Sequence, residues 1–226
     1  MLVLLERDTY MQLSKIKIKN YRLLTNAELE VDPRTTLIVG RNNTAKTSFF
    51  SCIANVLDGK PISFDDYPLL RREDFYAKVA LFMEKKLSYE DLCEQIEIIS
   101  IEFLVDYSLD DPDDNLGALS PFIIDVDVDT TTSLIRAEYR LKIDEKDLWA
   151  DLESSYYKNG IFSPNNEEAH KVLADNFGKW FGLTVYAINP NNPDDKQVKS
   201  QKELHDLFPF HAIPAERVLG EDDTHN

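Results

Sequence analysis

The sequence predicts an α/β fold with an antiparallel β portion. Two patterns predict it: apolar residues that alternate with polar ones, as in half-buried strands, and apolar residues at helical spacing in the segments between them. The composition agrees, because 43% hydrophobic and 11% aromatic residues are enough to bury a core. The 226 residues fit one large or two small domains, and no fibrous or solenoid period is present.

Two strands open the predicted fold. Over residues 14–20, Ile16 and Ile18 alternate with three lysines, and over residues 27–32 apolar residues alternate with acidic ones. Paired antiparallel, these strands would set a row of lysines against a row of acidic side chains, which is worth roughly a few tenths of a kcal/mol per pair.

An apolar run and a helix come next. Thr36–Gly40 predicts a short strand buried on both faces. Helical spacing of apolar residues begins after Lys46 and ends at Leu57, and Gly59 lies just beyond as a C-terminal stop. The predicted order is therefore buried strand, tight loop, amphipathic helix.

The rest of the chain repeats the same two patterns. The predicted elements are a loop over 61–74, helix over 75–95, strands over 99–107, 122–128 and 132–143, helices over 145–157 and 166–181, and short strands over 183–188 and 210–213.

Charge and cysteine usage limit the function classes. The formal net charge is −16, with +3 in residues 1–50 and −19 in the rest, so generic nucleic-acid binding by this segment alone is disfavoured. Cys52 and Cys93 have no CxxC spacing and no partner histidine cluster, so neither a zinc site nor a disulfide framework is supported, and a reducing cytoplasm is expected. The opening apolar run of five residues is too short to span a membrane or to act as a signal sequence, so no membrane partner is expected.

The chemistry-bearing motif is Gly40–Ser48. It matches the phosphate-loop template G-x-x-x-x-G-K-[ST] at Gly40, Lys46 and Thr47, while Ala45 replaces the second glycine. The preceding buried strand and the following helix are the context that the template requires. Backbone N–H groups of such a loop converge on an anion, and the helix dipole adds to the attraction.

The motif predicts an ATP and Mg²⁺ site. Lys46 would reach the β- and γ-phosphates, and Thr47 would ligate the metal through its hydroxyl. The predicted nucleotide-binding residues of this loop are Gly40, Arg41, Asn42, Asn43, Thr44, Ala45, Lys46, Thr47 and Ser48.

The alternative is a plain strand-to-helix turn, although a lysine there would oppose the helix dipole without an anion. If the loop needs a positive φ at Ala45, the methyl group costs on the order of 1 kcal/mol. Weakened nucleotide affinity is then expected, and hydrolysis stays open.

A family resemblance rests on two stretches, Leu13–Arg22 and Thr36–Ser48, separated by the acidic strand. They resemble the amino-terminal signature of RecF/SMC-type ABC ATPases, and within that group they are most similar to the OLD (overcoming lysogenization defect) family. This family comprises ATP-dependent endonucleases and includes the GajA type, and the pair Asn42 and Asn43 is typical of that branch. The match covers residues 13–58, with a weaker one at Ile213–Arg217.

The resemblance implies a P-loop NTPase fold, a partial ABC/SMC-like ATPase head with an α/β insertion. Its division would be a leader over 1–12, then one lobe over 13–226, made of a P-loop core (13–58), inserted strands and helices (59–182) and a return to the core (183–226). In relatives, Arg22 or its neighbours lie near the adenine or ribose. The equally weighted alternative is that Arg22 is a solvent-exposed arginine in a turn.

Other ABC-type elements are missing from the sequence. No LSGGQ-like signature is present, and the apolar runs ending at Asp106 and Asp125 are followed by Tyr107 and Val126 where a Walker B strand has Glu. No catalytic residue is therefore assigned. The chain resembles the amino-terminal part of a longer ATPase, or a truncated member.

The resemblance thus predicts the ATP-binding lobe of an OLD-like ATPase, with ATP gating a nuclease or partner effector in DNA processing or anti-phage defence. Homodimers or higher oligomers would form through the ATPase heads, and DNA would be bound only by the complete protein. The alternative is a degenerate P-loop scaffold or regulatory module without hydrolysis. A P-loop kinase is a third possibility, which the long antiparallel region disfavours.

The aspartates near residue 125 suggest calcium, but the EF-hand template needs Gly after the third aspartate, where Thr130 stands. A strand with a solvated acidic face is the simpler interpretation. The four histidines have no metal-ligand spacing.

Overall fold

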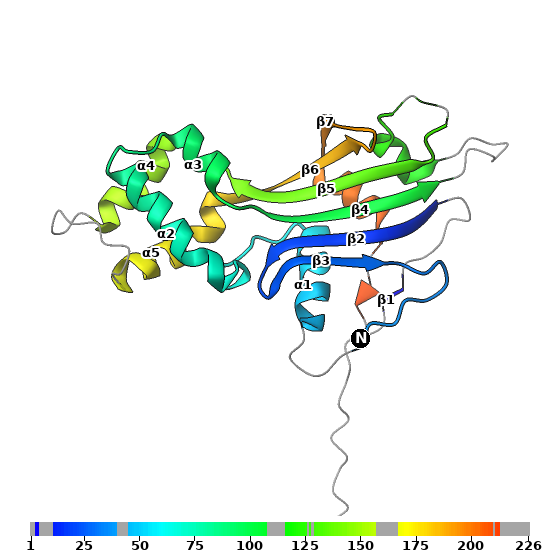
Figure 1. The fold of residues 1–226 in the computed structure, drawn as a ribbon, viewed down its shortest axis with the longest axis horizontal. Helices are drawn as coiled ribbons and strands as arrows, with labels where there is room; N and C mark the ends of the chain where they lie inside the picture. Colours follow the sequence, from blue (N-terminus) through cyan, green and yellow to red (C-terminus); the bar gives the residue numbers. More distant parts are fainter. Residues whose placement is uncertain are drawn as a thin grey trace, which may run out of the picture.

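In the computed structural model, the fold is described for residues 3–4, 11–39, 45–107, 116–125, 127, 129–156, 167–209 and 211–212. Its centre is a six-stranded antiparallel sheet with the strand order β3-β2-β4-β5-β6-β7 (Figure 1). The strands are β2 (Met11–Tyr21), β3 (Leu24–Glu30), β4 (Ile99–Tyr107), β5 (Thr132–Leu141), β6 (Phe181–Asn189) and β7 (Asn192–Lys199).

Two short strands form a separate pair. β1 (Val3–Leu4) lies antiparallel to β8 (His211–Ala212). Two residues of the predicted leader therefore pair with a segment about 200 positions away, within the range assigned to the return to the core.

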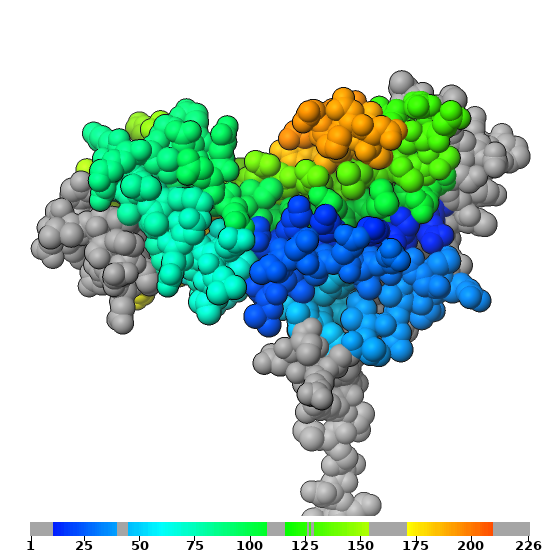
Figure 2. All heavy atoms as spheres, viewed as in Figure 1, coloured from blue at the N-terminus to red at the C-terminus, as the bar shows by residue number. Residues whose placement is uncertain are grey.

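The helices fall into two groups. α1 (Lys46–Leu57) and α6 (Gln201–Leu207) pack against the sheet and each other. The helical lobe lies beyond one end of the strands (Figures 1 and 2). It consists of α2 (Leu69–Met83), α3 (Tyr89–Gln95), α4 (Glu145–Tyr156) and α5 (Glu167–Trp180). Two short 3₁₀ turns, η1 (Phe64–Asp66) and η2 (Gly117–Phe122), complete the described elements.

Alternation along the strands gives the sheet an apolar inner face and a polar outer face. On the inner face Ile18 pairs with Ile101, and Ile101 with Ala137, all fully buried. One position along, Lys17 pairs with Glu102, and Glu102 with Arg136 on the outer face. The inner face packs against α1 and α6, which places α1 firmly on the core.

The predicted pairing of the first two strands is confirmed. Lys15 lies opposite Glu30 and Lys17 opposite Glu28. The Lys15 ammonium forms an ion pair with Glu28 on the neighbouring rung at 2.6 Å, and this pairing raises the pKa of Lys15 and lowers that of Glu28.

The prediction of a buried strand at Thr36–Gly40 is wrong for its described part, 36–39. The segment joins no strand pair among the described residues. Leu37 and Val39 are 78% and 77% exposed, whereas Ile38 packs against the core. An apolar run predicts burial only if another element covers it, and here β3 is already the edge of the sheet.

The predicted strand at 122–128 is also wrong where it is described. Phe122 ends the turn η2, which contains Pro121, a residue without a backbone N–H to donate. Asp125 and Asp127 then accept hydrogen bonds from the backbone N–H two residues on, at 3.0 Å each. Such local bonds compete with a strand ladder.

The remaining differences have local causes. Helix α2 begins at Leu69 inside the predicted loop, directly after Pro68, which suits a helix start. Strand β7 was not predicted, because it is an exposed edge with no apolar alternation. Helix α6 was not predicted either, although Ser200 and Glu203 form a capping box that the sequence displays. The single helix predicted over 75–95 is wrong, because the chain forms two helices, α2 and α3, with Lys85 at a φ of 58° between them. The other predicted strands and helices agree with the structure to within a few residues.

Candidate phosphate-binding site

Ala45 occupies the N-cap of α1 in the left-handed conformation, with φ 63° and ψ 0°. Its carbonyl accepts the first helical hydrogen bond from Phe49 at 2.9 Å. The backbone therefore needs a positive φ at the position where the template has glycine, as expected if the loop has that geometry. A residue with a Cβ in this region costs roughly 1–2 kcal/mol.

The N-terminus of α1 is suited to an anion. Ala45 offers no side-chain cap and the first turn holds no acidic residue. The first N–H groups of a helix have no intrahelical acceptor, and the helix dipole makes this end positive. Lys46 is half-buried as the first helical residue, Thr47 is exposed, and Ser48 is buried.

The structure thus brings together Ala45, Lys46, Thr47 and Ser48 at one helix end. The other predicted loop residues, 40–44, lie outside the described residues. Within the described ranges there is no group of three or more His, Cys, Asp or Glu that could hold a metal ion. Metal ligation by the Thr47 hydroxyl stays a prediction.

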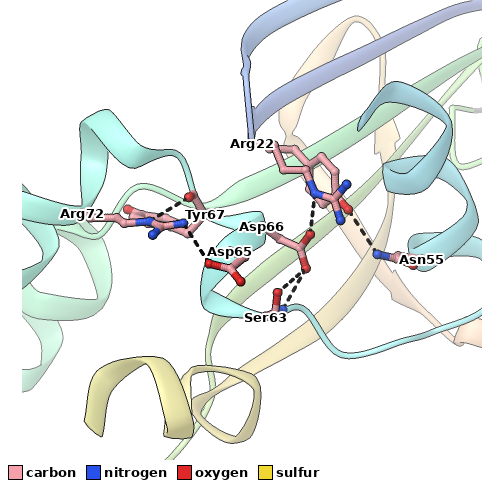
Figure 3. Close-up of polar contacts among 8 residues, drawn as sticks. Arg22, Asn55, Ser63, Asp65, Asp66, Tyr67 and Arg72 are labelled. Carbon is pink, nitrogen blue, oxygen red and sulfur yellow. Dashed lines mark hydrogen bonds and ion pairs between the residues drawn. The ribbon is translucent and has the colours of Figure 1, made fainter. Parts of the chain in front are cut away.

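Arg22 lies elsewhere, in the turn between β2 and β3, and it has a positive φ of 52°. Its backbone N–H donates to the Asp66 carbonyl at 2.8 Å and its Nε to Asp66 Oδ1 at 2.9 Å (Figure 3). The Arg22 side chain is 38% exposed, whereas that of Asp66 is 6% exposed. The structure therefore gives Arg22 a carboxylate partner in η1, and a contact with adenine or ribose stays a prediction.

Asp66 is the centre of what we call the Asp66 network: Tyr21, Arg22, Asn55, Ser63 and Asp66. Ser63 donates to Asp66 Oδ2 through its backbone N–H at 2.9 Å and its hydroxyl at 3.0 Å. The Tyr21 hydroxyl accepts from Asn55 Nδ2 at 3.2 Å, and Tyr21 directly precedes Arg22 in the chain. The network thus joins β2, η1 and α1 (Figure 3).

These bonds favour the charged carboxylate. Burial by itself would raise the pKa of Asp66, but hydrogen bonds from Ser63, Arg22 and Tyr21 outweigh it and hold that pKa below its ordinary value. For Tyr21, burial and the nearby Asp66 carboxylate raise the pKa, so the hydroxyl stays protonated.

The C-terminus of α1 accepts hydrogen bonds from a side chain that is distant in the sequence. Gln201 Nε2 donates to the carbonyls of Val56 at 2.6 Å and Leu57 at 2.9 Å. Gly59 follows with a φ of 64°, and a Cβ there would lie 3.0 Å from Gln201 Cγ. These contacts hold the helix end opposite Ala45, and the predicted role of Gly59 as a stop is confirmed.

The two ends of α1 are well separated. Asn55 follows Lys46 by nine residues, which is about 13 Å along a helix axis. Tyr21 contacts Asn55, and Arg22 is the next residue in the chain. The structure therefore places Arg22 near the C-terminal half of α1 and not with Ala45–Ser48.

Sequence reasoning missed Tyr21, Asn55, Asp66 and Gln201. Only Asp66 had a usable signal, because Ser63 and Asp66 have the spacing of a capping box, which they form. The partners of the other three lie at least 34 positions away in the chain.

The remaining candidates find ordinary partners. Asp125 accepts from Asn191 at 3.0 Å, and its pKa is lowered, chiefly by the backbone N–H of Asp127. Burial raises the pKa of Cys52 and of Cys93, which keeps both thiols protonated at neutral pH. None of the helices in the described ranges has the length and apolar character needed to cross a bilayer.

Comparison with known proteins agrees with the geometry at α1. Residues 11–225 match the family described as the AAA ATPase domain. A search of curated proteins finds no match. The family match covers nearly the whole chain and supports the predicted α/β P-loop fold class, which is confirmed.

Proposed function

Because the chain belongs to the AAA ATPase domain family, we propose that it binds ATP with Mg²⁺ at the N-terminus of α1. The observation that carries the proposal is Ala45, a left-handed N-cap on a helix that begins with Lys46. In this proposal residues 40–44 and Ala45 present N–H groups to the phosphates, Lys46 binds the β- and γ-phosphates, and Thr47 ligates the metal.

The family-level proposal goes further. We infer an OLD-like ATPase lobe spanning residues 13–226, in which ATP gates a nuclease or partner effector. The resemblance of residues 13–58 supports it. DNA would be bound by the complete assembly, since the net charge of −16 disfavours binding of a nucleic-acid backbone by this lobe alone. A cytoplasmic location belongs to the same proposal.

Exposed apolar side chains support assembly through this part of the fold. Leu37 and Val39 immediately precede the phosphate loop, and both are more than three-quarters exposed. Burying large apolar side chains that are exposed to water is energetically favourable. Pairing of ATPase lobes beside the nucleotide would supply such a cover.

An equilibrium titration with a fluorescent ATP analogue, with and without Mg²⁺, tests the proposal. Lys46→Ala should reduce affinity at least tenfold, because the ammonium contacts the phosphates. Lys60→Ala is the matched control, since Lys60 lies beyond the other end of the helix and pairs with Asp58. No binding by the unaltered protein, or equal loss in both variants, would refute the proposed site.

A second candidate is a P-loop scaffold that binds nucleotide without hydrolysis. The observation in its favour is Ala45 in the left-handed conformation, where the template has glycine and a methyl group is strained. Phosphate-release measurements separate the two, because a scaffold binds the analogue without releasing phosphate. If the methyl group of Ala45 weakens nucleotide binding, Ala45→Gly should tighten binding of the analogue whether or not the protein hydrolyses ATP.

A further inference from the structure

Helix α1 is held to the sheet by two kinds of contact with different geometric consequences. Its buried face packs apolar side chains, including Phe49, Cys52 and Ile53, against the core. Burial of this kind stabilises docking but is non-directional. Hydrogen bonds depend on distance and angle, so they determine how far a helix is rotated and where it lies along its axis.

The C-terminal half of α1 makes polar contacts with the rest of the fold. Asn55 donates to the Tyr21 hydroxyl at 3.2 Å, and the carbonyls of Val56 and Leu57 accept from Gln201. A helix of 12 residues is a rod of about 18 Å, so a small rotation or shift at one end moves the other end as well.

The backbone that carries the Tyr21 hydroxyl is held in place. Tyr21 is fully buried and lies in β2. The next residue, Arg22, bonds to Asp66 through its backbone N–H and its Nε, and Asp66 is held by Ser63 at the start of η1. Asn55 therefore meets an acceptor whose position is set by β2, by the following turn and by η1.

We propose that Tyr21 is a positioning residue for nucleotide binding: its hydroxyl, bonded to Asn55, sets the placement of α1 and hence of Ala45, Lys46 and Thr47 against the phosphates. This inference rests on the proposed nucleotide site. It assigns a role in ligand binding to a residue about 13 Å from that site along the helix. Oxygen ligands and N–H donors must be placed to within a fraction of an ångström, which makes affinity sensitive to small shifts.

The test is Tyr21→Phe, which removes the hydroxyl and keeps the ring. Tyr107→Phe is the matched control, because the Tyr107 hydroxyl is also buried on the sheet and donates to the Thr130 carbonyl at 3.0 Å, away from α1. The affinity for the fluorescent ATP analogue is measured well below the unfolding temperature of each variant. We expect Tyr21→Phe to weaken binding at least fivefold and Tyr107→Phe to change it less than twofold.

A double-mutant cycle with Asn55→Ala gives an independent measurement. If the Tyr21–Asn55 bond positions the helix, either single change should weaken binding by a similar factor and the double variant should lose little more. If one of the two single variants folds poorly, the other still tests the proposal, because each removes the same Tyr21–Asn55 bond. Hydrogen exchange of α1 amides should rise in both single variants and not in Tyr107→Phe.

The outcomes separate the two proposals. If the unaltered protein binds the analogue and Tyr21→Phe binds it as tightly as Tyr107→Phe does, the positioning role is overturned while the nucleotide site stands. Additive losses in the double-mutant cycle also overturn it. If the unaltered protein binds no analogue, the proposed function falls and this inference falls with it.

Discussion

Gln201 Nε2 lies 2.6 Å from the carbonyl oxygen of Val56, although 145 positions separate the two residues in the chain. One side chain of α6 thereby donates to two carbonyls in the last turn of α1, where the helix has too few N–H donors of its own. The packing is tight, because a Cβ on Gly59 would approach Gln201 Cγ to 3.0 Å.

This contact makes Gly59→Ala a sharp test of the helix end. The substitution places a Cβ at a φ of 64° and against Gln201, so we expect it to lower the free energy of unfolding by about 2 kcal/mol. Gly117→Ala is the control, because Gly117 also has a positive φ but no atom within 4 Å of its added Cβ. Urea unfolding should show a smaller loss of unfolding free energy for Gly117→Ala than for Gly59→Ala. In a protein that also carries Gln201→Ala, this difference should disappear.

Ala45→Gly should act in the opposite direction. It relieves the left-handed strain at the N-cap of α1, and we expect a gain of about 1 kcal/mol in the free energy of unfolding. The same change at Ala54, in the interior of the same helix, should cost about 1 kcal/mol. Thermal unfolding of the two variants measures both signs, and a loss at position 45 would contradict the strain.

Asp66→Asn should remove a pH-dependent part of the stability. Because the folded pKa of Asp66 is lowered, the charged network stabilises the fold above the unfolded pKa of about 4, and this contribution is lost as the pH falls through the folded pKa. We expect the variant to lose about 2 kcal/mol at pH 7 and less at pH 3.

Urea unfolding at the two pH values measures this difference. Asp65→Asn is the control, since its side chain is 93% exposed and lies 3.5 Å from Arg72, and it should change little at either pH. An Asp66→Asn loss that stays constant with pH would show that shape, and not charge, is what the network needs.

The exposed run before the phosphate loop gives another prediction. Replacing Leu37 by Ser and Val39 by Thr should change the free energy of unfolding by less than about 0.5 kcal/mol, because both side chains are already in water. Ile38→Ser should cost clearly more, since Ile38 packs against the core. Chemical unfolding compares the variants, and sedimentation shows whether the double change also reduces self-association.

Local patterns were enough to predict several elements. The alternation of Ile16 and Ile18 with lysines predicted the first strand and its pairing, and helical spacing after Lys46 predicted α1. The motif also identified position 45 as the one where the template has glycine, and the structure has a positive φ there. Each of these features depends on residues within a few positions of one another.

Burial at 36–39 and the polar contacts of α1 could not be predicted in the same way. An apolar run looks the same whether or not another element covers it, and Leu37 and Val39 are exposed. Asp66 reaches Arg22 across 44 positions, and Gln201 reaches Val56 across 145. The sequence by itself determined most of the strands and helices, because backbone preference and periodicity are local. Only the tertiary structure decided which side chains fix α1, because hydrogen bonds between distant segments exist only once the sheet has brought them together.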